Sequence, residues 1–277
     1  MAQSLQSLKR RIKTAQNIAQ IAKAMEMISA SKIKRAQKEV ENNKPYAERV
    51  KELTSTILTH IDLQKFDHPY VLGNESEKTL LIVISPDKGL CGSLNTNLFK
   101  KLLEVENKNY KVVALGKKVH QFAARLESEL VAGFNLGTTI PPYSLVFSLI
   151  EIINKEYKEG KVGKVEILFS RFNSIFSQEP VLQEILPIKP KHEEGQLPYL
   201  FEPTSEKIII DLLPYFLEAV LYNSMLEAFT SEQAARMVAM QNAKNNAFDI
   251  ADYLTLSYNK SRQERITNEL LSLSNNN

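Results

Sequence analysis

Hydrophobic positions near the N-terminus recur with the spacing of an α-helix. Apolar or small residues follow one another by three or four positions in two runs, as one helix face requires. The first run is Leu5, Leu8, Ile12 and Ala15, and the second is Ile18, Ile21, Met25 and Ile28. The join between the two runs is a step of three where a strict heptad needs four. The pattern therefore predicts a seam that drifts along the helix, as in an irregular coiled coil.

Glycine and proline place long helices at the two ends of the chain. All nine glycines lie between Gly73 and Gly195, and their absence over such long flanking stretches favours helix because glycine marks turns. Pro45 is expected to end or kink the first helix, with a second piece from about 46 to 60.

The C-terminal helix is expected to begin near Thr204, which is a weak N-cap because Lys207 rather than an acid follows three residues later. Nothing after Pro214 interrupts it up to about Leu271, which corresponds to roughly 85 Å of helix. A helix of that length needs a partner. We expect the N-terminal helix to pack against it as an antiparallel coiled coil.

The middle of the chain has the alternation of an α/β layer. Continuous apolar runs predict buried parallel strands, and amphipathic stretches between them predict helices. The expected strands are 79–85, 110–116 and 164–170, the expected helices are 95–106, 117–130 and 144–158, and 174–188 is a strand or hairpin arm. The predicted fold class is α/β, a long antiparallel coiled coil of the two terminal helices plus a small Rossmann-like domain. The predicted divisions are 1–60, 61–203 and 204–277.

Charge is unevenly distributed along a chain whose formal net charge is only +3. Residues 1–38 hold nine Lys or Arg and one acid, whereas 205–277 hold six Lys or Arg and nine Asp or Glu. The two ends therefore face different neighbours. A basic amphipathic start also suits a mitochondrial transit peptide, but no break in composition marks a cleavage point, and we favour a functional basic helix.

Composition makes several kinds of site unlikely to be carried by this chain. The one cysteine, Cys91, forms no internal disulfide or CxxC pair, and the four histidines lack metal-ligand spacing. No run approaches about 18 consecutive apolar residues, so no membrane span is expected. We expect no metal and no cofactor.

The loop SPDKGLCGSLN, 85–95, follows a predicted strand and precedes a predicted helix, as a phosphate-binding loop does. Its glycines, Gly89 and Gly92, form a bare G-x-x-G that matches neither the P-loop nor the dinucleotide pattern. The sequence ALGKKV at 114–119 also fails the P-loop test, and no nucleophile, base and acid are grouped anywhere. We expect Asp87 and the two glycines to form a structural loop and expect no catalytic residues.

The basic stretch KIKRAQK, 32–38, admits three interpretations. It suits a solvated helix face, an acidic protein partner or nucleic acid. Aromatic residues are absent from positions 1–45, so there is no platform on which bases could stack. We expect no nucleic-acid binding.

Three stretches closely resemble the γ subunit of F-type ATP synthases. They are LKRRIKTAQNIAQIAKAMEMISASKIKRAQ (8–37), SPDKGLCGSLN (85–95) and SEQAARMVAMQNAKNNAFDIADYLTLSYNKSRQERITNEL (231–270). The resemblance implies a rotor whose terminal helices turn inside a hexamer of α and β subunits while the α/β domain joins the ε subunit and the ring of c subunits. Proton flow would turn the ring and the shaft together, and the chain, present once per complex, would transmit torque for ATP synthesis on β without catalysing anything itself.

The resemblance also implies contact residues and a location. Positions that would face the hexamer are Met25, Lys32, Lys34, Arg35, Arg236, Arg262, Gln263, Thr267 and Glu269. The subunit would lie at the cytoplasmic face of a bacterial inner membrane and would associate with the membrane only through the complex. Two other hypotheses remain open: a small α/β nucleotide-binding enzyme with a coiled-coil arm, and a basic coiled coil that binds nucleic acid.

Overall fold

A computed structural model describes residues 5–61, 66–105, 109–126, 129–189 and 201–274. The chain divides into two compact units. The helical unit comprises Met1–Ser31 and Arg236–Asn277, and the sheet unit comprises Lys32–Ala235. The two boundaries fall inside the two longest helices, so each of these helices contributes one part to each unit.

The two terminal helices are α1, Leu5–Thr59, and α6, Ser205–Ser274. The start of α6 confirms the predicted cap, because the Thr204 Oγ1 accepts the Lys207 N–H at 3.3 Å. The prediction at Pro45 is wrong in one respect, because α1 continues through this proline without ending. The residues beyond Pro45 include Val50, Ile57 and Leu58, which are buried in the sheet unit's core, and this packing maintains the helix despite the missing N–H.

By length and composition alone, α6 could cross a membrane. Its most apolar 18-residue window has a mean hydropathy of 1.3, and 44% of that window is buried in the protein. This differs from the expectation based on uninterrupted apolar runs because such a window admits two charged residues. The core helix of a soluble protein has the same properties, and α6 carries core residues such as Leu213, Leu217 and Leu221.

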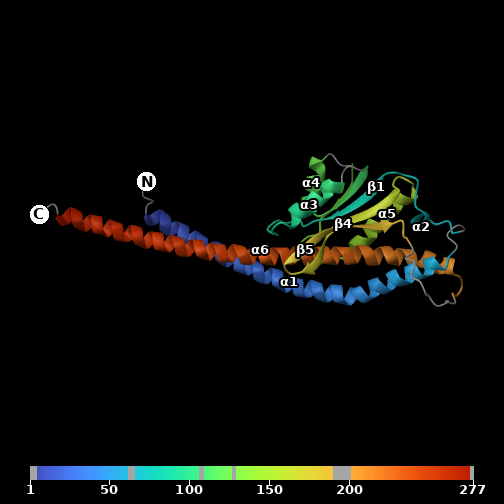
Figure 1. Ribbon diagram of the computed structural model, residues 1–277, viewed down its shortest axis with the longest axis horizontal. Helices are drawn as coiled ribbons and strands as arrows, with labels where there is room; N and C mark the ends of the chain where they lie inside the picture. The colour runs from blue at the N-terminus through green and yellow to red at the C-terminus, as the bar shows by residue number, and fades with distance from the viewer. Residues whose placement is uncertain (1–4, 62–65, 106–108, 127–128, 190–200, 275–277) are drawn as a thin grey trace. The chain divides into compact units, whose positions relative to one another are not determined.

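Five strands form one sheet in the order β3-β2-β1-β4-β5 (Figure 1). They are β1 Thr79–Ile84, β2 Tyr110–Leu115, β3 Glu129–Phe134, β4 Lys164–Ser174 and β5 Ser177–Leu186. The first four strands are parallel, and β5 returns antiparallel to β4 as a hairpin. Helix α2, Pro69–Leu72, precedes β1, and the helices between the strands are α3 Leu94–Val105, α4 Lys117–Arg125 and α5 Ser144–Lys158.

Strand β3 corrects the predicted order of elements. The helix expected over 117–130 ends at Arg125, and Glu129–Phe134 pairs with β2 at the sheet edge. Strands β1 and β2 are almost wholly buried, and β4 is buried over 167–170, whereas β3 is half-exposed and includes Gly133. An edge strand of that composition lacks the apolar run by which buried parallel strands are identified.

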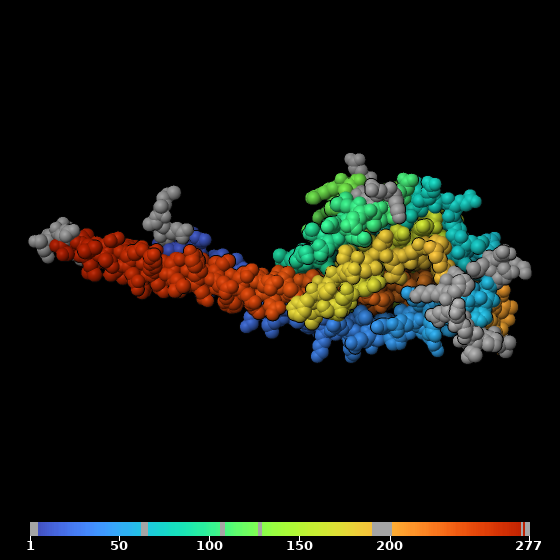
Figure 2. Space-filling view, viewed as in Figure 1, coloured from blue at the N-terminus to red at the C-terminus, as the bar shows by residue number. Residues whose placement is uncertain are grey.

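Alternating side chains of the sheet build two hydrophobic layers. Leu81 and Val83 face α3 and α4, while Leu80 and Ile82 face α5 and the parts of α1 and α6 that belong to the sheet unit. Strands covered on both faces by helices define a three-layer α/β/α arrangement. In the space-filling view the yellow β4–β5 hairpin runs between the green helices α3 and α4 and blue α1 (Figure 2).

Candidate functional site

The buried face of α1 in the helical unit consists of small residues. It comprises Leu8, Ala15, Ala19, Ala22 and Ser29, all between 0% and 7% exposed. The steps between neighbouring members of this seam are three, four or seven, so they follow a strict heptad. Alanine and serine at a helix interface let the two helix backbones approach closely, because there is little side chain to separate them.

The second apolar run predicted for this face points outward instead. Ile18, Ile21 and Ile28 are 50%, 61% and 55% exposed. The prediction was right for Leu8 and Ala15 and wrong for these three isoleucines, because it followed residue size rather than the alanine heptad. The pattern A-x-x-x-A-x-x-A at 15–22 is the signal that identifies the true seam, and it also removes the predicted drift.

The part of helix α6 that belongs to the helical unit repeats this arrangement. Its seam includes the buried residues Met240, Ala247, Ala251 and Leu254, while Phe248, Ile250, Tyr253 and Leu256 are 46–71% exposed. Figure 1 shows the two helices side by side in this unit, with the N- and C-terminal ends of the chain on the same side, as an antiparallel pair requires. The predicted antiparallel coiled coil is therefore present.

An ion pair fixes the register of the two helices. The Lys244 ammonium lies 2.8 Å from the Glu26 carboxylate, and both side chains are 21% exposed. A partly shielded pair of this kind selects one longitudinal alignment, because sliding one helix by a heptad would separate the two charges.

The outward surface of the helical unit carries large apolar side chains among its polar ones. Isoleucines on α1 and aromatic and aliphatic residues on α6 are exposed along both helices. Large apolar side chains exposed along a helix pair favour a place that another chain covers. The helical unit therefore presents the candidate functional surface, and that surface suits partner binding.

The predicted contact residues of α1 divide between the two units. Met25 is half-buried in the helical unit. In the sheet unit, Lys34 and Arg35 are exposed, whereas the Lys32 ammonium donates a hydrogen bond to the Thr138 carbonyl. Lys32 thus ties α1 to the loop that follows β3, while its two basic neighbours face solvent.

The predicted contact residues of α6 differ in exposure. Arg236 is 9% exposed, whereas Arg262, Gln263, Thr267 and Glu269 are exposed near the end of the helix. The Thr267 hydroxyl donates to the Gln263 carbonyl at 3.0 Å, and the Arg265 guanidinium donates to Glu269 at 2.8 Å. The Thr267 hydroxyl and the Glu269 carboxylate therefore have hydrogen-bond partners within the helix. Arg262 and the Gln263 amide are the groups most open to a partner.

The loop at 85–95 caps a helix with its own side chains. The Asp87 carboxylate accepts the N–H groups of Lys117 at 2.8 Å and Gly137 at 2.7 Å. The Ser85 hydroxyl accepts the Val119 N–H at 2.9 Å, and the Pro86 carbonyl accepts the Lys118 N–H at 3.3 Å. These residues satisfy the first N–H groups of α4, where a phosphate would otherwise bind.

The remainder of the loop packs against α6. Leu90 and Gly92 have φ angles of 63° and 58° and turn the chain sharply, whereas Gly89 does not adopt a positive φ. The turn places the buried Cys91 in a cluster with Leu94 and Ala235 of α6. The sequence analysis expected a structural loop, but it did not find this contact with the C-terminal helix.

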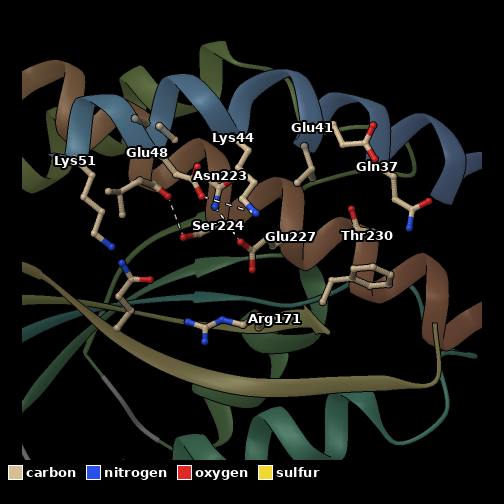
Figure 3. Close-up of a pocket in the computed structure, with 16 residues that line it drawn as sticks. Gln37, Glu41, Lys44, Glu48, Lys51, Arg171, Asn223, Ser224, Glu227 and Thr230 are labelled. Carbon is tan, nitrogen blue, oxygen red and sulfur yellow. Dashed lines mark hydrogen bonds and ion pairs between the residues drawn. The ribbon is translucent and has the colours of Figure 1, made fainter. Parts of the chain in front are cut away.

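A polar groove of about 490 Å³ lies between α1, α6 and the β4–β5 hairpin of the sheet unit (Figure 3). Lys44, Lys51 and Arg171 point into it together with Glu227, which accepts a hydrogen bond from Asn223 at 2.9 Å. Burial raises the pKa of Glu227. The charges of both signs are interspersed, and no nucleophile is paired with a base among these lining residues. None of the predicted site residues lines the groove.

Within the ranges that the structure describes, no three His, Cys, Asp or Glu side chains are grouped closely enough to hold a metal ion. The described residues of the helical unit offer surfaces that suit partner binding. Two long helices joined antiparallel through small residues, apolar on the outside and continuous with an α/β layer, define a shaft-like class of subunit.

Comparison with known proteins identifies the family. The profile of the family described as ATP synthase matches residues 4–274. The chain is 38% identical to the ATP synthase gamma chain of Dehalococcoides mccartyi strain BAV1, over 98% of this chain and 96% of the relative. It is 36% identical to that of Paraburkholderia xenovorans, over 96% of each. The chain belongs to the ATP synthase gamma chain family.

A solved structure supports the fold. A chain in the rotor of the Euglena gracilis mitochondrial ATP synthase matches with a TM-score of 0.68, covering 95% of this chain and 98% of that one, at 17% identity. The two long helices and the central sheet are therefore the fold of this family.

Proposed function

We propose that this chain is the central rotor subunit of an F1Fo ATP synthase. It transmits torque between a proton-driven c ring and the catalytic β subunits, and it contributes no catalytic residue itself. Family membership supports this function, and one structural observation carries it: the helical unit packs through alanines and turns its large apolar side chains outward. Such a surface suits a shaft enclosed by other subunits.

The geometry explains how a shaft can turn against its surroundings. The seam resists separation of α1 from α6, because small residues bring the helices close and the Glu26–Lys244 pair holds their register. The outer face carries side chains such as Ile21 and Tyr253, which make non-directional contacts. Contacts of that kind can be exchanged during rotation without breaking fixed hydrogen bonds.

Charged contacts would set the angular position of the shaft. Lys34 and Arg35 are exposed on α1, and Arg262 is exposed on α6. Opposite charges on the β subunits would attract them at particular rotational positions, because electrostatic complementarity gives specificity. Met25, Arg236, Gln263, Thr267 and Glu269 would complete the contact set, and Lys32 would brace α1 against the sheet unit.

The sheet unit would stay outside the hexamer of α and β subunits, where it would join the ε subunit and the c ring. The complex would lie at the cytoplasmic face of a bacterial inner membrane, with this chain attached only through its partners. Asp87, Ser85 and Pro86 of the loop at 85–95 occupy the first N–H groups of α4, which would otherwise be open to an anion. This disfavours the nucleotide-binding enzyme as an alternative.

Reconstitution tests the proposal. The full chain is mixed with purified α and β subunits, and native mass spectrometry and ATP hydrolysis are measured. We expect one copy of this chain per hexamer and ATPase activity that depends on it. A chain that stays outside the hexamer, or that binds ATP alone with a defined stoichiometry, would contradict the proposal.

A charge variant tests the angular contacts. Lys34→Glu combined with Arg35→Glu should preserve assembly while lowering ATP-driven rotation several-fold, because both side chains are exposed and attract acidic partners. The matched control is Lys155→Glu with Lys158→Glu, an exposed basic pair on α5 in the sheet unit, outside the proposed contact set. Equal rotation rates in the two double variants would remove Lys34 and Arg35 from the contact set.

A further inference from the structure

An aromatic patch lies on the sheet unit, away from the residues so far given a function. It consists of five rings from α1, α5 and α6, namely Tyr46, Tyr143, Phe147, Tyr215 and Tyr222. The first four are 49%, 40%, 50% and 52% exposed. Large aromatic side chains that remain exposed together mark an interaction surface, because tyrosine and phenylalanine are enriched where proteins bind one another.

Three rings of the patch, Tyr143, Phe147 and Tyr222, are held in a fixed arrangement. Tyr143 packs edge-on against Phe147, with ring centroids 5.5 Å apart, and against Tyr222 at 4.9 Å. Its hydroxyl donates a hydrogen bond to the Glu218 Oε2 at 2.7 Å. A surface that is ordered before binding loses less conformational entropy when a partner arrives.

Glu218 and Glu39 are the carboxylates whose charges act on the rings of the patch. Burial raises the pKa of Tyr46, and the charge of Glu218 raises it further. Burial likewise raises the pKa of Tyr222, with a further contribution from Glu39. The Glu218 Oε1 takes no hydrogen bond from any described residue, so one carboxylate oxygen remains available beside the rings.

Aromatic faces around an available carboxylate are the chemistry that recognises an organic cation. A guanidinium or ammonium group gains cation–π attraction from the rings and a charge-assisted hydrogen bond from the carboxylate. A negatively charged ligand would be repelled by Glu218 and Glu39, and a purely apolar one would leave the Glu218 Oε1 desolvated and unpaired.

We propose that the aromatic patch binds an Arg or Lys side chain presented by a protein partner of the sheet unit. This inference rests on the proposed function, since it assigns the patch to a subunit that meets the chain outside the hexamer. The cation pairs with Glu218 Oε1, while its aliphatic stem lies against the Tyr215 and Phe147 rings.

Photocrosslinking identifies what occupies the patch. A benzophenone amino acid replaces Tyr215 or Phe147 in the assembled complex, and the products are mapped by mass spectrometry. We expect crosslinks to a segment of another subunit within a few residues of an Arg or Lys. Phe176, which is 81% exposed between β4 and β5, is the control position and should not yield the same product.

Substitutions test the recognition chemistry. Binding of the crosslinked subunit to the full chain should weaken about tenfold for Glu218→Gln and more for Glu218→Lys. Glutamine keeps an acceptor for Tyr143 but removes the charge. Tyr215→Phe, which keeps the ring, should bind within twofold of the parent, whereas Tyr215→Ala should weaken binding about tenfold. Glu179→Gln, an exposed carboxylate on β5, serves as the matched control, and thermal melts verify folding.

Some outcomes would overturn the inference. Crosslinks confined to segments that lack a basic residue would do so, and so would unchanged binding by Glu218→Lys. Co-sedimentation of the chain with phosphatidylcholine vesicles that is lost in Tyr215→Ala would assign the patch to a lipid headgroup instead. These results are distinct from a failure of the rotor function, because that failure would appear as loss of hexamer entry by the unsubstituted chain.

Discussion

The two parts of α6 use hydrophobic residues in opposite ways. In the sheet unit, Leu213, Leu217 and Leu221 are at most 1% exposed. In the helical unit, Ala247 and Ala251 are buried while Phe248 is 46% exposed. Along one continuous helix, leucines form the buried face in the sheet unit, whereas in the helical unit alanines share the buried face with Met240 and Leu254, and Phe248 turns outward. Hydrophobicity alone therefore does not tell which residues of α6 are buried. The size of the buried residues distinguishes the core of the sheet unit from the thin seam of the helical unit.

The difference predicts how the units respond to substitution. The sheet unit has backbone approaches and buried charges that leave little room for adjustment, so single changes should be costly. The helical unit has a thin seam and an exposed apolar exterior, so changes outside the seam should affect assembly more than stability. The experiments below challenge this contrast in order of expected effect.

Gly116→Ala should produce the largest loss in the free energy of unfolding. Gly116 has a φ of 103°, and an added Cβ would lie 1.9 Å from the Ser85 carbonyl oxygen. Because backbone must shift to relieve that contact, we expect a loss of about 4 kcal/mol or more in the free energy of unfolding. Urea denaturation followed by circular dichroism measures it.

Gly137→Ala is the matched control. Gly137 also has a positive φ, 76°, but an added Cβ meets nothing within 4 Å. It should cost only about 1 kcal/mol, the conformational penalty alone. Equal losses at the two glycines would show that the approach of Ser85 to Gly116 does not constrain the sheet unit.

Lys111→Met should produce the second largest loss of stability. Lys111 is 9% exposed on β2, and its ammonium lies 2.7 Å from Glu156 on α5 and 3.2 Å from Glu129 on β3. Removing it leaves Glu156 buried and poorly paired, which costs about 3 kcal/mol. Adding Glu156→Leu should recover most of the loss, and a double variant no more stable than the single one would contradict this account.

The same network predicts a pH dependence. The hydrogen bond to Glu156 raises the pKa of Lys111, so its contribution to stability is complete below the unfolded value of about 10.5 and is lost as the pH rises through the folded value. The hydrogen bond from Lys111 lowers the pKa of Glu129. That contribution is present above about pH 4.5 and is lost as the pH falls through the folded value. Both slopes should flatten in Lys111→Met.

Most of the sheet unit could be predicted from the sequence because its strands are buried on both faces. The apolar runs LLIVI in β1, VVAL in β2 and ILF in β4 indicate buried strands, although polar residues such as Lys111 and Glu166 interrupt the last two strands. Strand β3 could not be found in this way, because an edge strand is half-exposed. An end of the helix at Pro45 was wrong because local propensity was judged without the core contacts that maintain α1 beyond it.

Substitutions in the α1–α6 seam of the helical unit should have an intermediate effect on stability. Ala22 is 4% exposed and Ile21 is 61% exposed on the same helix. Ala22→Leu forces the two helices apart and should cost about 2 kcal/mol, measured by thermal unfolding of the full chain. Ile21→Ala should change stability by less than about 0.5 kcal/mol and should instead weaken entry into the hexamer. The reverse ranking would mean that the seam has been assigned to the wrong face.

Which side chains are exposed on the two long helices was harder to predict than the fold. The basic residues at Lys34 and Arg35 stand out in the sequence, and the structure leaves them exposed. The exposed isoleucines, in contrast, look like a core when judged by polarity, and only the alanine heptad beside them reveals which stripe is buried. Intrahelical bonds at Thr267 and Glu269 depend on side-chain rotamers, which periodicity does not specify.

Removing the Glu26–Lys244 pair should have the smallest effect on stability. The experiment shows what sets the register of the helical unit. Both side chains are 21% exposed, so solvent screens the pair and a double-mutant cycle with Glu26→Gln and Lys244→Met should give a coupling of about 1 kcal/mol at low salt. Raising the ionic strength should reduce that coupling. If the coupling is zero while disulfide crosslinking between cysteines placed at the two positions remains efficient, the alanine seam alone determines the alignment. Packing of the seam would then set both the register and the stability of the helical unit, just as packing stabilises the sheet unit.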